Sequence, residues 1–271
     1  MAAHTGKSPP PADPSPPVDA RRPLLRRYGL VVPGLDPAHD GLRVAHLSDL
    51  HVGILTPHSF IRNAVTMIQA EKPDLVVMTG DFVCYSQRFV GPFADIIAGF
   101  DVPTVCVLGN HDYWTDGHGV ADALTHHGYD VLRNQHTQIS IRHAPLSIVG
   151  IDDAATGQAD AARAFRGVTA GGSRLILSHV PSQADRAATF GSGLILSGHT
   201  HGGHIDVIPG MTANLFRKLG APYLKGFYRV GESMLYVSCG VGSSSVPIRA
   251  GSPAEVAILT LHAHPAPGDI A

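Results

Sequence analysis

Apolar and polar positions alternate in regular blocks from about residue 41 onward. Short apolar runs predict strands, and apolar residues at helical spacing predict helices between them. Strands are expected at 42–47, 75–79, 102–108, 146–149, 174–178, 194–197 and 235–238. Helices are expected over 60–68 after Ser59 as N-cap, around 93–100, and over 120–127 before Gly128. This alternation favours a layered α/β fold.

The two ends of the chain lack this pattern. Six prolines in the first twenty positions are typical of a disordered or polyproline-II segment. A basic stretch then carries Arg21, Arg22, Arg26 and Arg27. We expect a solvated linker here, with weak peripheral contact to an anionic membrane as the alternative. The predicted organisation is therefore a tail at 1–40, a folded domain at 41–262 and a loose tail at 263–271.

Composition narrows the class of protein. The 271 residues are 44% hydrophobic and 15% charged, as expected for one or two globular domains. A formal net charge of −2 predicts no specific nucleic-acid binding. Three cysteines without Cys-x-x-Cys spacing argue against a disulfide framework or a thiolate zinc site. No apolar run reaches the roughly 20 residues of a membrane span. We expect a cytoplasmic protein, with membrane-peripheral placement as the alternative.

Ligand-capable polar residues follow five of the predicted strands directly. These segments are Asp49-Leu50-His51, Gly80-Asp81, Gly109-Asn110-His111-Asp112, His179 and Gly198-His199-Thr200-His201. One such segment alone is typical of an ordinary turn. Because ligands of open α/β sheets bind outside the carboxyl ends of the strands, all five are expected to converge.

The residue types indicate a metal centre. Aspartate, imidazole and amide oxygen suit Mn, Fe or Zn ions. Seven candidate ligands exceed what one tetrahedral ion needs: Asp49, His51, Asp81, Asn110, His179, His199 and His201. Two divalent or mixed-valence ions about 3.5–4 Å apart would use them all and activate a bridging water. We therefore predict phosphoester hydrolysis through in-line attack by a metal-bridging hydroxide.

These motifs, in this order, resemble those of the calcineurin-like metallophosphoesterase superfamily from about residue 41 to about residue 260. The resemblance implies a layered double β-sandwich flanked by helices, with two metals at the strand ends. It implies that one metal is held by Asp49, His51 and His201. It implies that the other is held by Asn110, His179 and His199. Asp81 would bridge both ions.

The resemblance also assigns two catalytic residues. His111 would bind phosphate and protonate or stabilise the leaving oxygen, and Asp112 would orient His111. Within the superfamily, the chain resembles the compact bacterial YaeI-like phosphodiesterases. Supporting segments are Gly202-Gly203, Tyr223 to Tyr228, Tyr236-Val237-Ser238, Gly240-Val241-Gly242 and Pro247-x-Arg249. Two positions depart from the group, His204 and Cys84, and both are expected near the pocket, where they would affect substrate preference.

The leading prediction is a phosphodiesterase or pyrophosphohydrolase that acts on a small-molecule or lipid-linked phosphoester. A phosphomonoesterase using the same site is one alternative, and a catalytically weak metal-binding scaffold is another. The His111-Asp112 pair argues against a scaffold, since a pure binder does not require it. An amidohydrolase is disfavoured, because those barrels open with His-x-His on the first strand. Arg249 is a further candidate for contact with a substrate phosphate.

Overall fold

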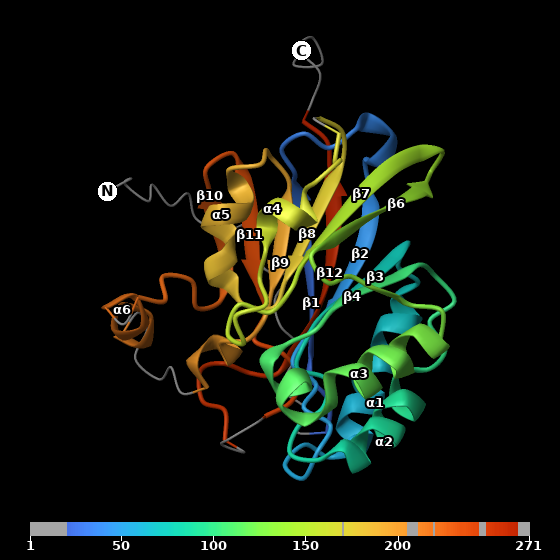
Figure 1. Cartoon of the computed structure of the whole chain (residues 1–271), viewed down its shortest axis with the longest axis vertical. Helices are drawn as coiled ribbons and strands as arrows, with labels where there is room; N and C mark the ends of the chain where they lie inside the picture. The colour runs from blue at the N-terminus through green and yellow to red at the C-terminus, as the bar shows by residue number, and fades with distance from the viewer. Residues whose placement is uncertain (1–20, 170, 205–210, 219, 244–247, 265–271) are drawn as a thin grey trace.

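Two six-stranded sheets packed face to face form the centre of the molecule, and helices cover both outer faces (Figure 1). The computed structural model describes residues 21–169, 171–204, 211–218, 220–243 and 248–264. This architecture confirms the predicted double β-sandwich flanked by helices.

The first sheet has the order β1-β12-β2-β3-β4-β5. Its strands are β1 (Leu24–Val31), β2 (Leu42–Leu47), β3 (Leu75–Thr79), β4 (Thr104–Val107), β5 (Asp130–Val131) and β12 (Glu255–His262). Strands β2 to β5 run parallel, and β12 is antiparallel to β2. The carboxyl ends of β2, β3 and β4 therefore lie at one edge.

The second sheet has the order β10-β11-β9-β8-β7-β6. Its strands are β6 (Gln135–Ile141), β7 (Ala144–Ile151), β8 (Arg174–Ser178), β9 (Leu194–Ser197), β10 (Gly226–Val230) and β11 (Ser233–Val237). Strands β7, β8, β9 and β11 are parallel to one another, with the antiparallel β6 and β10 at the two edges.

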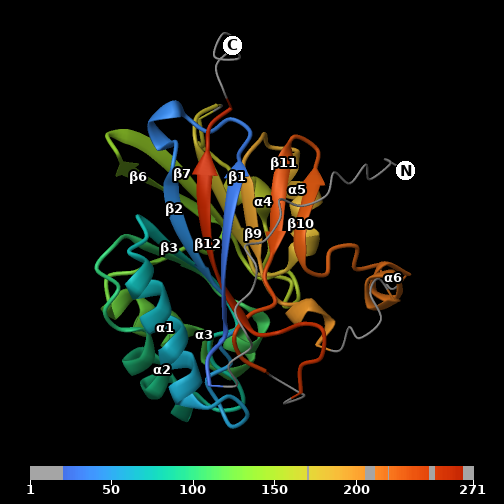
Figure 2. The same cartoon turned by 180° about the vertical axis from the view of Figure 1, so that it is seen from behind.

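Helices α1, α2 and α3 cover the first sheet, and α4 and α5 cover the second (Figures 1 and 2). The helices are α1 (His58–Glu71), α2 (Val90–Ile97), α3 (Asn110–His126), α4 (Ala161–Ala164), α5 (Ala184–Ala188) and α6 (Met211–Lys218). Within the described ranges, four 3-10 turns lie at η1 (Pro37–His39), η2 (Gln87–Phe89), η3 (Pro181–Gln183) and η4 (His201–Gly203). Helix α6 stands apart from both helical layers (Figure 2).

Strand residues alternate between two apolar layers. Leu75 and Val77 of β3 face the second sheet, whereas Val76 and Met78 pack under the helices. Because both faces of each sheet are covered, the central strands are mainly apolar on both faces rather than alternately polar. That is why the short apolar runs at 42–47, 75–79, 174–178 and 194–197 predict four strands with the correct limits.

Two expectations from the sequence are wrong. Residues 24–31 and 37–39, assigned to a disordered tail, form β1 and η1, and β1 pairs in parallel with β12. Ser59 does not cap α1, because the N-cap position is Pro57 and no side chain caps it. The proline-rich segment at 1–20 and residues 265–271 lie outside the described residues.

Membrane contact through the basic cluster stays the alternative that the sequence offers, and two of the four arginines form ion pairs within the protein. Arg26 lies 3.6 Å from Glu255 of β12, and Arg27 lies 2.5 Å from Glu71 of α1. Both arginines thus attach β1 to its neighbours. Within the described part of the chain, no helix has the length and apolar character needed to cross a bilayer.

Candidate metal centre

The carboxyl ends of both sheets meet at a single site. Nδ1 of His179, after β8 in the second sheet, lies 2.7 Å from the carbonyl oxygen of Thr79 in β3. The backbone N–H of His199, after β9, donates to Asp49 Oδ1, after β2, at 3.0 Å. These bonds bring together turns that are up to 150 residues apart in the sequence.

Two groups of potential ligands lie side by side at this site. In the first, Nε2 of His201 is 3.0 Å from Nε2 of His51 and 3.5 Å from Asp49 Oδ1. In the second, Nε2 of His179 is 3.2 Å from Asp81 Oδ2 and 3.1 Å from Nδ1 of His199. Asp81 Oδ2 also lies 3.6 Å from Nε2 of His51, so Asp81 links the second group to the first.

Asn110 begins α3, directly before His111, whose backbone N–H donates to Asp81 Oδ1 at 2.8 Å. The Asn110 side chain is buried, and its Oδ1 has no hydrogen-bond partner among the described residues. An unsatisfied buried acceptor costs about 1–3 kcal/mol. Coordination of a cation would remove this cost. The oxygen and nitrogen donors gathered here therefore fit a transition-metal site.

The backbone at this site is strained. Five of the seven candidate ligands have φ between 46° and 72°, in the left-handed region that non-glycine residues avoid: Asp49, His51, Asp81, His199 and His201. Each such residue costs of order 1–3 kcal/mol and persists only where the surroundings hold it. Concentration of this strain at one edge is typical of a functional site.

Two glycines permit the close approach of the turns. A side chain at Gly109 would collide with the Asp81 carboxylate. A side chain at Gly198 would collide with Ser48 and Asp49. Both glycines are required for space, which explains the Gly-Asn-His-Asp and Gly-His-Thr-His motifs.

Burial disfavours charge on most of these side chains. It raises the pKa of Asp49 to about 6 and lowers the pKa of His51 to about 3 and that of His199 to about 4. Burial also opposes ionisation of Asp81, but the charge and hydrogen bond of His179, with the charges of His51 and His111, together outweigh burial and hold the Asp81 pKa well below its usual value. The protein alone thus balances Asp81 with a protonated His179. A bound cation would supply that positive charge instead.

His111 lies at the edge of the site, and its ring centroid is 4.8 Å from that of His51. The structure places Asp112 differently from the role that the resemblance implies. Its carboxylate accepts the backbone N–H groups of Gly109, Phe82 and Val83 at 2.8–3.0 Å. Among the described residues, it makes no hydrogen bond to the His111 ring. Asp112 therefore ties the turn after β4 to the turn after β3.

The comparison with known families decides the identity of this domain. A family model described as calcineurin-like phosphoesterase matches residues 42–203, more than half of the chain. The chain belongs to this family. The match confirms the predicted metallophosphoesterase and its class, a metal-dependent hydrolase.

Relatives of this metallophosphoesterase cover most of its length. The uncharacterized metallophosphoesterase YkuE of Bacillus subtilis is 28% identical over 82% of this chain and 79% of its own. Phosphodiesterase YaeI of Escherichia coli is 30% identical over 74% of this chain and 75% of its own. A transmembrane protein with a metallophosphoesterase domain from Bos taurus is 31% identical over 91% of this chain, which spans only 59% of that protein. Among solved structures, a 5'-nucleotidase precursor from Thermus thermophilus is 15% identical with a TM-score of 0.45, over 81% of this chain and 54% of its own.

A hydrogen-bonded chain behind Asp49 was not predicted. Ser48 Oγ donates to Asp49 Oδ2 at 2.6 Å, Thr79 Oγ1 donates to Ser48 at 2.8 Å, and Nε2 of the buried His46 lies 2.8 Å from Thr79 Oγ1. These hydrogen bonds fix the position of the Asp49 carboxylate. His46 and Thr79 lie inside strands, so no local sequence signal separates them from ordinary core residues.

Arg249 and His204 flank His201. The His204 ring stacks on the His201 ring at 4.5 Å, and Nη2 of Arg249 lies 3.0 Å from Nδ1 of His201. Because guanidinium only donates, Nδ1 accepts in this arrangement. If Nε2 held an ion, the ring proton of His201 would have to lie on Nδ1. Nδ1 could then no longer accept from Arg249, which would turn toward its carbonyl acceptors, such as that of Cys239.

Cys84 and Tyr113 lie beside the centre rather than in it. Cys84 is buried next to Gly53, and burial raises its pKa to about 12, so the thiol is neutral. Tyr113 donates to Asp152 Oδ1 at 2.5 Å. Asp153 holds a local turn by accepting the N–H of Thr156 at 2.6 Å.

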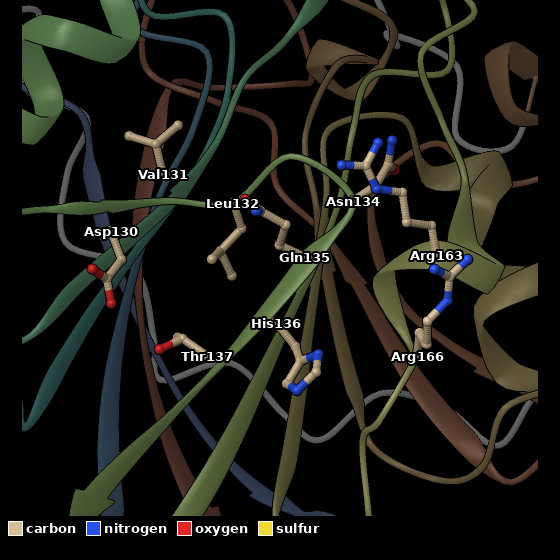
Figure 3. A pocket seen from close by; sticks show the side chains of 9 residues that line it. All are labelled: Asp130, Val131, Leu132, Asn134, Gln135, His136, Thr137, Arg163 and Arg166. Atoms are coloured by element: carbon tan, nitrogen blue, oxygen red, sulfur yellow. The ribbon is translucent and has the colours of Figure 1, made fainter.

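The two open hollows described on the surface lie outside the metal centre. One, of about 470 Å³, is lined by β5, β6 and the arginines Arg163 and Arg166 (Figure 3). Its neighbour, of about 500 Å³, adds Arg133 and Asp152. Neither hollow is lined by a candidate ligand, so the metal centre is identified by its cluster of Asp, His and Asn side chains and not by a hollow.

Proposed function

We propose that this chain is a dinuclear-metal-dependent phosphodiesterase or pyrophosphohydrolase. The observation that carries the proposal is the pair of adjacent ligand groups, Asp49-His51-His201 and Asp81-His179-His199, together with the unsatisfied Asn110 oxygen. One ion would be held by Asp49, His51 and His201. The other would be held by Asn110, His179 and His199.

Two divalent ions bound here, Mn, Fe or Zn, would activate a water molecule and neutralise the phosphoryl oxygens. The protein's own residues do the rest. Asp81 holds its carboxylate toward both groups, since Oδ1 accepts the His111 N–H at 2.8 Å and Oδ2 lies 3.2 Å from His179 Nε2 and 3.6 Å from His51 Nε2. The half-buried His111 ring is the group placed to give a proton to the departing oxygen.

The names of two relatives favour a diester or pyrophosphate over a monoester. YaeI is named a phosphodiesterase, and LpxG of Chlamydia trachomatis, 28% identical over 81% of this chain, is named a UDP-2,3-diacylglucosamine pyrophosphatase. Both reactions cleave a phosphorus–oxygen bond at a phosphorus that carries two ester or anhydride links.

The test is hydrolysis of bis(p-nitrophenyl) phosphate by the full chain loaded with Mn²⁺. Asp81→Ala should lower turnover by about 10³-fold or more, because Asp81 is the ligand that both proposed ions share. Faster hydrolysis of p-nitrophenyl phosphate would indicate a phosphomonoesterase. Background rates on both esters with two ions bound would indicate the metal-binding scaffold and overturn the proposal.

A further inference from the structure

Exposed apolar side chains gather at one end of the molecule. Among the described residues, seven large apolar side chains are exposed: Val31, Ile54, Tyr85, Trp114, Met211, Leu215 and Ile248. Single exposed apolar residues are normal on any protein surface. Six of the seven lie on turns or elements next to the candidate ligands, and such a grouping needs an explanation. We call these six, all except Val31, the apolar rim.

Three members of the apolar rim follow candidate site residues on the first sheet. Ile54, 63% exposed, comes three residues after His51. Tyr85 comes four residues after Asp81, and its ring lies against Gly53, beside Ile54.

Trp114 comes three residues after His111. Its ring centroid is 5.0 Å from that of His111.

The other three members come from the side of the second sheet. Ile248 precedes Arg249, which contacts His201. Met211 and Leu215 lie one turn apart on α6. A side chain at Gly203 would lie 2.6 Å from Thr212 of α6, so α6 adjoins the turn that carries His201.

Val31 lies at the opposite end of the sheets. It pairs with His262, and the preceding residue of β12, Leu261, pairs with Leu42 at the start of β2. The metal-ligand edge is at the other end of β2. Val31 therefore provides an internal control of the same chemical type.

We propose that the apolar rim binds the apolar substituent of an amphiphilic phosphoester while its phosphate occupies the metal centre. This proposal rests on the proposed function and names its substrate class. A small polar ester would leave the rim in water. The rim is continuous with the site through the Trp114–His111 and Ile248–Arg249–His201 contacts. A tail that extends from a bound phosphate would therefore lie across these side chains.

The chain contains one tryptophan, and that residue, Trp114, is 66% exposed in the rim. Its fluorescence can therefore report binding without catalysis. The Zn²⁺-loaded full chain is titrated with butyl phosphate and with decyl phosphate below its micelle concentration. Because each buried methylene is worth about a factor of four, decyl phosphate should bind at least about 50-fold tighter and shift the emission to the blue.

Paired variants locate the binding surface. The double variant I54S/L215S should lose at least about tenfold in decyl phosphate affinity, with butyl phosphate affinity and thermal unfolding unchanged. V31S should keep the affinity of the natural chain. Equal affinity for both alkyl phosphates, or equal losses in V31S and I54S/L215S, would overturn the proposal. A blue shift with phosphatidylglycerol vesicles but not with monomeric decyl phosphate would also overturn it, in favour of membrane docking.

A kinetic arm separates this proposal from the proposed function. In a series of alkyl p-nitrophenyl phosphates, kcat/KM should rise at least about 30-fold from the methyl to the octyl ester. Tight decyl phosphate binding without hydrolysis of any ester would refute the proposed function and leave the rim as a binding site. Hydrolysis independent of chain length would refute the rim and leave the proposed function.

Discussion

The interior between the two sheets and the carboxyl-end edge of the same sheets follow opposite rules. Between the sheets, buried side chains such as Leu75, Leu175 and Leu194 are apolar and lie in regular strands. At the edge, buried side chains such as Asp49 and His179 are ionisable, and five candidate ligands have positive φ. The side chains named here are buried in both regions, so burial alone does not distinguish them.

The difference shows where stability has been exchanged for chemistry. The interior obeys propensity, patterning and apolar burial together, as expected for a region selected for folding. The edge violates several of these rules in adjacent turns, because ionisable side chains are buried there and non-glycine residues have positive φ. A bound cation would offset the cost of the buried carboxylates. Each prediction below perturbs one of the two regions.

Apart from Asp81→Ala, the largest effect is expected at His111. His111→Ala should lower hydrolysis by about 10²–10⁴-fold, the usual contribution of a general acid. The loss should be larger for esters with poor leaving groups than for nitrophenyl esters, and metal content by elemental analysis should stay unchanged. His51, Asp81 and His111 also lie close enough to one another to hold an ion together. Loss of an ion in His111→Ala would therefore show that His111 is a ligand and would contradict its assignment as the general acid.

Most of the interior and the candidate ligand set could be predicted from the sequence. Apolar runs that end in Asp, His or Asn identify both the strands and the residues at their carboxyl ends. The geometry of the turns could not be predicted. The role of Asp112 depends on backbone groups of Phe82 and Val83, about 30 residues away.

Strand β1 was missed for a different reason. Its sequence, LLRRYGLV, is rich in arginine and follows a proline-rich segment. Its partner β12 lies more than 200 residues later. The arginines are accommodated by Glu255 and Glu71, which no local pattern indicates.

In the interior, Leu175→Ala should lower the free energy of unfolding by about 2–5 kcal/mol, because it leaves a cavity between the sheets. Leu175→Met, which conserves volume, should cost less than about 1.5 kcal/mol. Urea denaturation measures both. Activity per folded molecule should not change, and a specific loss of activity in Leu175→Ala would contradict the separation of the two regions.

At the edge, Asp49→Asn should stabilise the metal-free protein at pH 8. Burial raises the pKa of Asp49 from 3.8 to about 6, so the ionised carboxylate lowers stability progressively as pH rises from about 4 to 6. Asparagine removes this penalty, for a gain on the order of 1–3 kcal/mol at pH 8 and none at pH 4. Urea denaturation with EDTA tests this, and Zn²⁺ should reverse the sign at pH 8. Destabilisation of the metal-free variant at pH 8 would refute the prediction.

The smallest effect is expected on β1. Arg27→Met should lower the free energy of unfolding by about 0.2–1 kcal/mol, the usual value of an exposed ion pair. A double-mutant cycle with Glu71→Gln isolates the pair. A coupling energy of zero would contradict the attachment of β1 to α1 through these side chains.

The central claim is that the seven candidate residues hold two ions that share Asp81. Anomalous diffraction at the manganese edge from crystals of the Mn²⁺-loaded chain tests it most directly. The account predicts two peaks, one bordered by Asp49, His51 and His201 and the other by Asn110, His179 and His199, with the Asp81 carboxylate between them. A single peak, or peaks away from Asp81, would contradict it.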